Sequence, residues 1–202
     1  MSILKAASIS QFFQDFVDES VKARNVTATE GARSYLVSLL TEFAHPRTEE
    51  TLDRPLTFQL EEALHLPDLA DRFERLRILG DGVLYTSGFF AEHFEARGVD
   101  PEYVIGIGRT AYKSAGALMR PSSSPDLDAV VEIDIFGELA AKFSDFVAVI
   151  ADVADSTAAR GTGDSKTLLR LYERWLKTRS DRLADALSSH GFVPPRGKSV
   201  LS

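Results

Sequence analysis

The sequence predicts an all-α protein: a single-domain bundle of about seven to eight helices that ends in an antiparallel pair of helices. Apolar residues recur at intervals near 3.6 in almost every segment, whereas strict alternation rarely lasts more than a few residues. Prolines and glycines fall between these segments, at positions where helices begin or end. The chain has 202 residues, of which 44% are hydrophobic, so it can bury a core without disulfides or metal ions.

The first two helices are expected to begin at hydroxyl-bearing caps. Ser8 or Ser10 precedes an apolar stripe, and either side chain can accept a bond from a free backbone N–H of the first turn. Thr27 or Thr29 is expected to begin the second helix. This helix should stop before Pro46, because a proline cannot continue it.

Two further helices are expected on either side of Pro67. One covers about Leu56–Leu66, and Asp68 caps the other. The sequence then becomes apolar and aromatic from Val83 to Phe90, without a clear solvent face. We expect this run to form a buried helix with a kink near Gly80.

Small residues dominate the next expected helix, from Pro101 to about Arg120. Gly98 is expected to end the preceding helix, and Asp100 to cap this one. Three glycines lie inside it, and each costs about 0.8–1.0 kcal/mol relative to alanine in a helix. We therefore expect this helix to pack very closely against a neighbour, because close packing offsets that cost.

A stretch rich in proline and serine, at 121–125, is the clearest expected hinge. We expect residues 1–190 to form one helical domain, which this hinge would divide into subunits 1–120 and 126–190. Residues 191–202 have no periodic apolar pattern, so an irregular tail is expected there.

Charge is segregated between two expected helical segments of the second half. Residues 122–165 contain nine acids and two bases, whereas residues 166–202 contain eight bases and three acids. Their net charges are therefore −7 and +5. A short connector that contains glycine favours an antiparallel pair, with the acidic flank beside the basic one. The same stripes would also pair between two chains, so we expect a homodimer through the C-terminal helices.

Composition argues against several classes of function. The chain lacks cysteine, has a net charge of −7, and contains no apolar run long enough for a signal peptide or a bilayer span. We expect a cytoplasmic protein that does not bind membranes. Cations interleaved with Tyr172 and Trp175 are also typical of nucleic-acid contacts, but the neighbouring acidic segment explains them without such a partner. We therefore do not expect nucleic-acid binding.

Two Glu-x-x-His pairs, Glu42 with His45 and Glu62 with His65, have the spacing that places both side chains on one helix face. Two such pairs resemble half of the ferritin-like di-iron pattern, which implies a di-iron or di-manganese centre. Unlike in that family, each pair lies in the last turn of an expected helix. The alternative, which we favour, is that the helix dipole stabilises each histidine there and that the protein holds no cofactor.

We expect no catalytic residue. Ser87 lacks the flanking glycines and the strand-to-helix context of a nucleophile elbow. The run of glycine, serine and lysine at 161–167 lacks both the preceding strand and the spacing of a phosphate-binding loop. Neither His93 nor His190 has a triad-like neighbour in the sequence.

Residues 80–117 read GDGVLYTSGFFAEHFEARGVDPEYVIGIGRTAYKSAGA. This segment resembles a widespread bacterial family of all-helical proteins of unknown function, in which a GD-x-x-LY-x-SGFF run precedes a VD-x-x-Y…G-x-x-AY run. The resemblance implies a helical fold. It implies no catalytic or ligand-binding residue, because none is known for the family.

The same segment contains the best candidate ligand site. Its aromatic side chains would line a pocket for an apolar ligand, and three polar side chains would contact that ligand. The aromatic candidates are Tyr85, Phe89, Phe90, Tyr103 and Tyr112, and the polar candidates are Asp81, Ser87 and Arg109. The alternative is that these residues form the packed centre of the fold.

Taken together, these features predict a regulatory or scaffolding module that binds another protein or itself, without catalysis. Two alternatives stay open. One is a small-molecule-binding protein or enzyme that uses the aromatic and glycine-rich segment 80–112. The other is a di-metal carboxylate oxidase built on the two Glu-x-x-His pairs.

Overall fold

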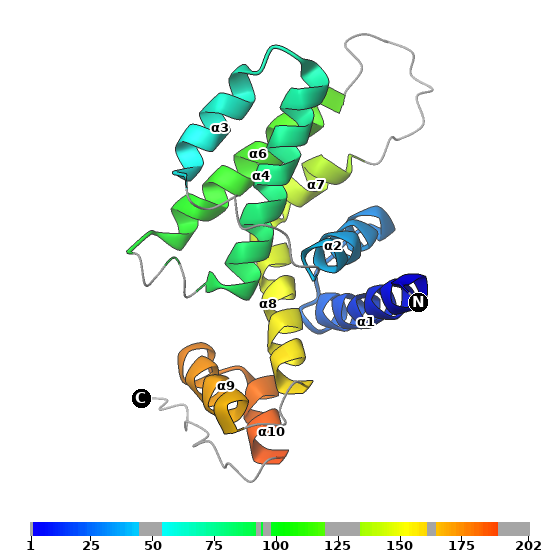
Figure 1. The fold of residues 1–202 in the computed structure, drawn as a ribbon, viewed down its shortest axis with the longest axis vertical. Helices are drawn as coiled ribbons and strands as arrows, with labels where there is room; N and C mark the ends of the chain where they lie inside the picture. The colour runs from blue at the N-terminus through cyan, green and yellow to red at the C-terminus, as the bar shows by residue number, and fades with distance from the viewer. Residues whose placement is uncertain are drawn as a thin grey trace. The chain divides into compact units, whose positions relative to one another are not determined.

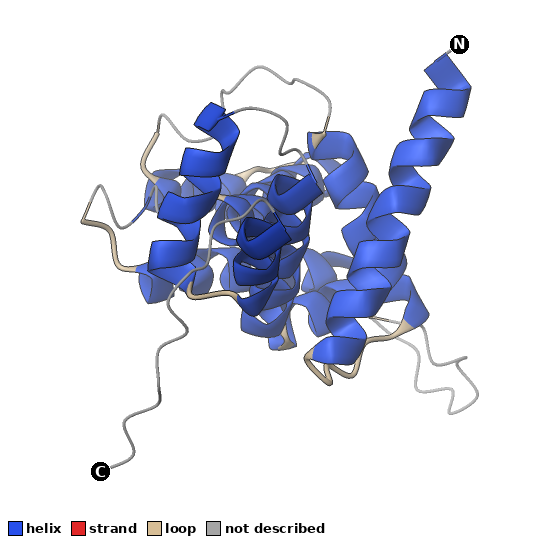
Figure 2. Ribbon diagram, turned by 90° about the horizontal axis from the view of Figure 1, so that it is seen from below, coloured by secondary structure: helices blue, strands red, loops and turns tan. Residues whose placement is uncertain are grey.

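A computed structural model of the 202-residue chain describes residues 2–44, 54–91, 94, 98–119, 134–160 and 165–189. Within these ranges the chain forms nine helices and no strand, which confirms the predicted all-α class (Figure 1, Figure 2). The helices are α1 (Ser2–Ala23), α2 (Glu30–Phe43), α3 (Leu56–His65), α4 (Leu69–Phe89), α6 (Pro101–Met119), α7 (Ile135–Ala141), α8 (Phe143–Arg160), α9 (Ser165–Thr178) and α10 (Asp181–Ser189).

The described helices number nine, more than the seven or eight expected, because the helical segments of the second half are divided. α4 runs unbroken through Gly80, because that glycine lies against another helix and not at a break. The acidic segment after the predicted hinge forms two helices, α7 and α8, which are separated at Lys142, where φ is −108° and ψ is 24°. α9 and α10 are separated at Arg179, whose φ of 53° lies in the left-handed region.

Capping residues begin several helices where the sequence predicts them. The Thr29 hydroxyl accepts a bond from the backbone N–H of Ala32 at the start of α2. The Asp68 carboxylate accepts two backbone N–H bonds at the start of α4. The first helix is an exception, because it begins at Ser2 and not after Ser8 or Ser10. The intervening Leu, Lys and Ala residues are strong helix formers, so the helix extends through them.

The chain divides into two compact units, unit 1 (Met1–Ala151) and unit 2 (Asp152–Ser202), whose boundary lies inside α8. The predicted hinge at 121–125 and the predicted tail at 191–202 lie outside the described residues, so both stay predictions. No helix in the described ranges combines the length and the apolar character needed to cross a bilayer.

Glycines allow the helices of unit 1 to approach closely, as the small residues of the sequence predict. A Cβ atom at Gly80 of α4 would lie 2.5 Å from the ring of Tyr112 on α6. At Gly108 of α6 it would lie 2.7 Å from Cγ1 of Val83 on α4. These two contacts also show that α4 and α6 are antiparallel, since the later residue of one helix meets the earlier residue of the other.

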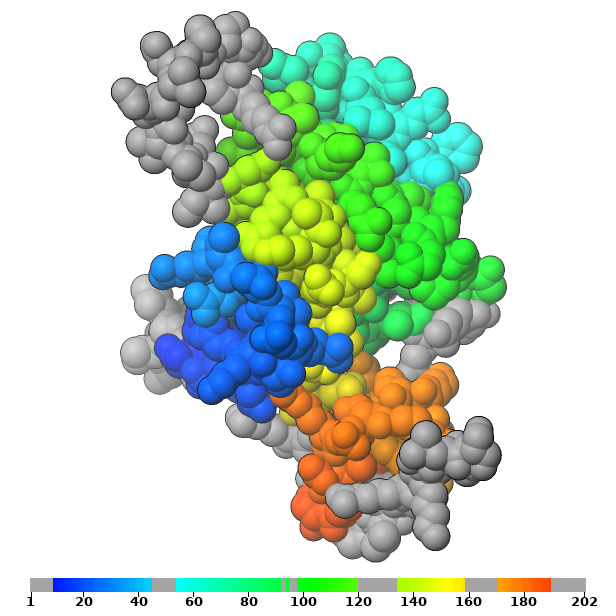
Figure 3. Space-filling view, turned by 180° about the vertical axis from the view of Figure 1, so that it is seen from behind, coloured from blue at the N-terminus to red at the C-terminus, as the bar shows by residue number. Residues whose placement is uncertain are grey.

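α2 and α7 lie side by side although they are far apart in the chain (Figure 3), and a polar contact ties them together. Glu138 accepts bonds from the backbone N–H and the hydroxyl of Thr29, and Lys142 donates both to Glu138 and to the carbonyl of Thr27. Burial opposes ionisation, but the bonds from Thr29 and Lys142 hold the pKa of Glu138 below its ordinary value. Glu138 therefore stays charged and fixes the beginning of α2.

Unit 2 has a small core of its own on α9 and α10. Leu171 and Trp175 of α9 pack with Leu183 and Leu187 of α10. Two arginines connect these helices to the end of α8, where both acceptors are buried: Arg174 bonds to Asp155 at 2.6 Å, and Arg182 to Ser156 at 2.9 Å. An acid of the negative segment thus pairs with a cation of the positive one.

Candidate functional site

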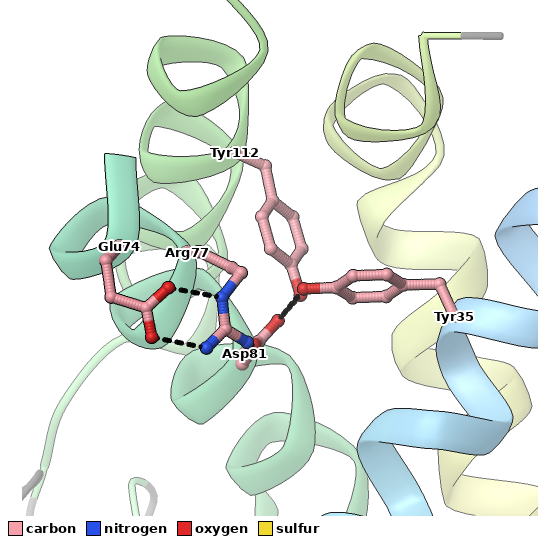
Figure 4. A network of polar contacts seen from close by, with 5 residues as sticks. All are labelled: Tyr35, Glu74, Arg77, Asp81 and Tyr112. Atoms are coloured by element: carbon pink, nitrogen blue, oxygen red, sulfur yellow. Dashed lines mark hydrogen bonds and ion pairs between the residues drawn. The ribbon is translucent and has the colours of Figure 1, made fainter. Parts of the chain in front are cut away.

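The Asp81 carboxylate lies at the centre of unit 1 and accepts three hydrogen bonds. Only 5% of this residue is exposed, in the middle of α4. Its Oδ1 accepts bonds from the hydroxyls of Tyr35 on α2, at 2.6 Å, and Tyr112 on α6, at 2.7 Å. Its Oδ2 accepts a bond from Nη1 of Arg77 at 2.7 Å. Figure 4 draws these four side chains as sticks. One carboxylate thereby joins three helices.

Local structure explains why these side chains meet. Arg77 precedes Asp81 by one helical turn, so both side chains lie on the same face of α4. Tyr112 reaches Asp81 across Gly80, because a side chain at position 80 would occupy the space of the tyrosine ring. Tyr35 enters from α2, with its ring at a right angle to that of Tyr112 and 6.3 Å away.

Arg77 extends this cluster to the surface. Its Nε and Nη2 bond to the two carboxylate oxygens of Glu74, at 3.0 and 2.7 Å, in a planar two-point contact (Figure 4). About half of the Glu74 side chain is exposed to solvent. We call Tyr35, Glu74, Arg77, Asp81 and Tyr112 the Asp81 network.

The electrostatic balance at Asp81 is set by opposing effects. Burial raises the pKa of Asp81 above its ordinary value, and the charge of Glu42 on α2 raises it further. The bonds from Tyr35 and Tyr112 and the charge of Arg77 oppose this rise. Burial and the nearby Asp81 charge also raise the pKa of both tyrosines, so both hydroxyls keep their protons and donate. The network is therefore an acceptor surrounded by donors.

An aromatic row begins one turn beyond Asp81 on α4. The Tyr85 ring stacks on Phe43 of α2, with centroids 4.4 Å apart, and on Phe89, at 4.7 Å. Phe90 meets the edge of Tyr85 at 5.9 Å and is 51% exposed. We call Phe43, Tyr85, Phe89 and Phe90 the aromatic row. It leads from the α2–α4 contact to the surface.

The structure thus gathers the predicted ligand residues into two groups. Asp81 and Tyr112 share the buried network, and Tyr85, Phe89 and Phe90 share the aromatic row. The other three lie elsewhere on the same two helices. Ser87 is buried, and its hydroxyl has no partner among the described residues. Tyr103 is 49% exposed, and the exposed Arg109 bonds to the hydroxyl of Ser144 at 3.2 Å.

The four candidate metal ligands form no such cluster in the part of the chain that the structure describes. Glu62 is exposed and pairs with Arg54 at 3.0 Å, while Nδ1 of the exposed His65 bonds to the carbonyl of Glu61. The charge of Glu42 on α2 raises the pKa of Asp81, and His45 lies outside the described residues. No group of three or more His, Cys, Asp or Glu side chains in the described ranges could hold a metal ion.

Sequence reasoning missed Tyr35, Glu74 and Arg77. A local signal existed for Arg77 and Glu74, because an aspartate on a buried helix needs a partner and a cation stands one turn before it. No local signal marks Tyr35, which lies 46 residues from Asp81 and on another helix. Its stripe of apolar neighbours indicated only that it faces the core.

Comparisons with known proteins give no match: no protein-family model matches this sequence, and neither the curated proteins nor the solved structures contain a significant relative.

Proposed function

We propose that this protein is a non-catalytic helical module that binds another protein or a second copy of itself, in a regulatory or scaffolding role. The observation that carries the proposal is the exposed end of the aromatic row. Phe90 closes α4, and Tyr103 lies in the first turn of α6. Because α4 and α6 are antiparallel, these two half-exposed rings lie at the same end of the pair.

Exposed aromatic side chains on a rigid base favour protein binding. Aromatic residues are enriched at the centres of protein interfaces, where they bury a large area with little loss of conformational freedom. Phe90 is supported from behind by Tyr85 and Phe89, so its ring is held in place before any partner arrives. A fixed ring of this kind lowers the entropic cost of binding.

The polar residues of the site support a role without catalysis. Both oxygens of Asp81 are taken by internal donors, and both tyrosine hydroxyls are directed at that carboxylate. A general acid or base must instead reach a substrate atom at hydrogen-bond distance. The described network is therefore better suited to holding helices together than to moving protons to a substrate.

Two cations of unit 2, one on α9 and one directly after it, support a protein partner over nucleic acid. Arg174 is paired with Asp155, and the Arg179 guanidinium lies 4.8 Å from the centre of the Trp175 ring. Cations that are occupied in this way contribute less to a phosphate contact.

We extend the proposal in two ways. The C-terminal helices are one surface through which the protein would form a homodimer. The protein would be located in the cytoplasm. Membership of the bacterial helical family is likewise proposed on residues 80–117 alone.

A small-molecule ligand is the second candidate, and one observation favours it. The Ser87 hydroxyl is buried without a partner among the described residues, although buried hydroxyls are usually hydrogen-bonded. A bound molecule would supply the missing acceptor or donor. Native mass spectrometry of the purified chain tests this idea, because a bound ligand adds a discrete mass that disappears after denaturation.

Matched surface variants test protein binding. Phe90→Asp and Tyr103→Asp each place a charge on the proposed surface, and Phe58→Asp is the control because Phe58, on α3, is 61% exposed. Sedimentation velocity over micromolar concentrations and quantitative affinity capture measure self-association and partner binding. We expect the first two variants to lose the interaction and the control to keep it. A monomer without a stoichiometric partner, or an equal loss in all three variants, would refute the proposal.

A further inference from the structure

One face of α6 is exposed along most of the helix. Its residues follow one another at intervals of three or four, so they form a continuous stripe. The exposed members are Glu102, Tyr103, Arg109, Thr110 and Lys113, and the half-buried Gly106 lies among them. Figure 3 shows α6, in bright green, at the surface beside α3. The described helices of unit 1 therefore leave this face open to a partner.

Gly106, in the middle of this face, differs from two other glycines of α6. A Cβ atom at Gly108 or Gly116 would lie 2.4 or 3.1 Å from a side-chain atom of another segment. Close packing inside unit 1 thus offsets the helical cost of these two glycines. A Cβ atom at Gly106 would meet no described atom within 4 Å. The described fold offers no such compensation there, whereas a helix packed over Gly106 would.

The charges on this face complement a second copy of the same face. Glu102 lies near the start of α6, and Arg109 and Lys113 follow it by seven and eleven residues, so all three lie on one flank. If a second α6 runs antiparallel, with Gly106 of both copies at the two-fold axis, Glu102 lies beside Arg109 and Lys113 of the second copy. A parallel arrangement would bring like charges together. Among the described residues, neither Glu102 nor Lys113 has an ionic partner in its own chain.

The other flank of the face supplies an aromatic ring and a small side chain to meet it. Tyr103 is 49% exposed, and Thr110 lies two turns further on the same flank. In the antiparallel arrangement, the ring of Tyr103 lies over Thr110 of the second copy. The Thr110 hydroxyl already donates to the carbonyl of Gly106 at 2.8 Å. Burial of this hydroxyl therefore costs little, because its hydrogen bond is already made.

We propose that the exposed face of α6 binds the same face of a second copy of this chain, antiparallel and with Gly106 at the two-fold axis. This inference rests on the proposed function and names its partner. Each attraction between Glu102 and the two cations then occurs twice, as in any contact between identical surfaces. One helix face buries a small area, so we expect a weak dimer that forms at micromolar concentrations.

Paired charge reversals in the full-length chain test the arrangement. Glu102→Lys and Lys113→Glu should each weaken the dimer about tenfold, because each places like charges at both symmetry-related contacts. An equimolar mixture of the two variants should recover the affinity of wild type, because both contacts of the mixed dimer again join opposite charges. Glu173→Lys, an exposed reversal on α9, should change nothing, and it tests the C-terminal helices as the alternative surface.

Sedimentation velocity measures each association, and circular dichroism checks that every variant remains helical. A mixture that associates no better than the separate variants would overturn the proposal. So would a loss confined to Glu173→Lys.

Introduced cysteines test the register, because the chain has none of its own. Gly106→Cys should give a disulfide-linked dimer under mild oxidation, since the two copies of this position meet at the axis. Lys113→Cys should not, because its two copies lie about 21 Å apart along the helices, beyond the reach of a disulfide. Equal cross-linking of both variants, or of neither, would contradict the antiparallel pair.

Failure of this inference can be told apart from failure of the proposed function. A monomeric wild type that still captures a different protein through Phe90 would overturn self-recognition and leave the proposed function intact. A wild type that neither self-associates nor captures a partner would refute both.

Discussion

Two glycines of α6, only two residues apart, should respond in opposite ways to the same substitution. A Cβ atom at Gly106 would have no heavy atom within 4 Å. A Cβ atom at Gly108 would lie 2.4 Å from Cζ of Phe143 and 2.7 Å from Cγ1 of Val83. Both neighbours are almost fully buried, so neither ring nor methyl group can move aside freely.

The expected magnitudes follow from these distances. Alanine is favoured over glycine inside a helix by about 0.8–1.0 kcal/mol, so Gly106→Ala should stabilise unit 1 by about that amount. Gly108→Ala gains the same helical preference but overpacks the core, which typically costs about 1–3 kcal/mol. Because the helical term is common to both variants, their unfolding free energies should differ by the packing cost alone.

Urea unfolding followed by circular dichroism measures this difference. Fluorescence of Trp175 should be recorded separately, because the single tryptophan of the chain lies in unit 2. We expect a higher midpoint than wild type for Gly106→Ala and a lower one for Gly108→Ala, with unchanged slopes. If Gly108→Ala is as stable as Gly106→Ala, then α4, α6 and α8 do not approach as closely as described and the packing argument is wrong.

Three further predictions concern buried polar groups. Tyr112→Phe removes one donor from Asp81 and should cost about 1.5–3 kcal/mol of unfolding free energy, measured by urea titration, because the lost bond ends on a charged acceptor. The pKa of Glu138 is lowered in the fold. The charged carboxylate therefore stabilises the fold fully above the ordinary pKa of 4.5, and this stabilisation disappears as the pH falls through the lower pKa of the folded state. The thermal unfolding midpoints of wild type and Glu138→Gln should therefore converge in acid. Arg174→Met leaves the buried Asp155 unpaired and should destabilise unit 2 by about 3–5 kcal/mol. Tryptophan fluorescence would show this as an unfolding transition at a lower urea concentration. An unchanged transition in any of these experiments would show that the corresponding contact contributes nothing.

The helical architecture could be read from the sequence because its signals are local. Thr29 and Asp68 begin helices where their side chains reach the next turn, and the periodic apolar stripes mark the buried faces. The glycines of α6 indicated close packing through their helical cost alone. The break at Lys142 left no comparable signal, since no proline or glycine marks it.

Only half of the candidate site could be predicted, because some of its contacts join residues that are far apart in the sequence. Asp81 and Tyr112 were identified within one continuous segment, and they do share a buried bond. Tyr35 belongs to a distant helix, so its contact depends on how α2 packs and not on any neighbour in sequence. Likewise, the local sequence pattern does not distinguish the half-exposed Tyr103 from the fully buried Tyr112. Which of the two is buried depends on the face that α6 turns toward α4.

The bond between Thr29 and Glu138 also affects the order of events during synthesis. The two residues are 109 positions apart, so the start of α2 is made long before its acceptor exists. At about 5–20 residues per second, the ribosome needs roughly 5–20 s to bridge that interval. During this time the nascent N-terminal helices carry an apolar face that the later helices have not yet covered.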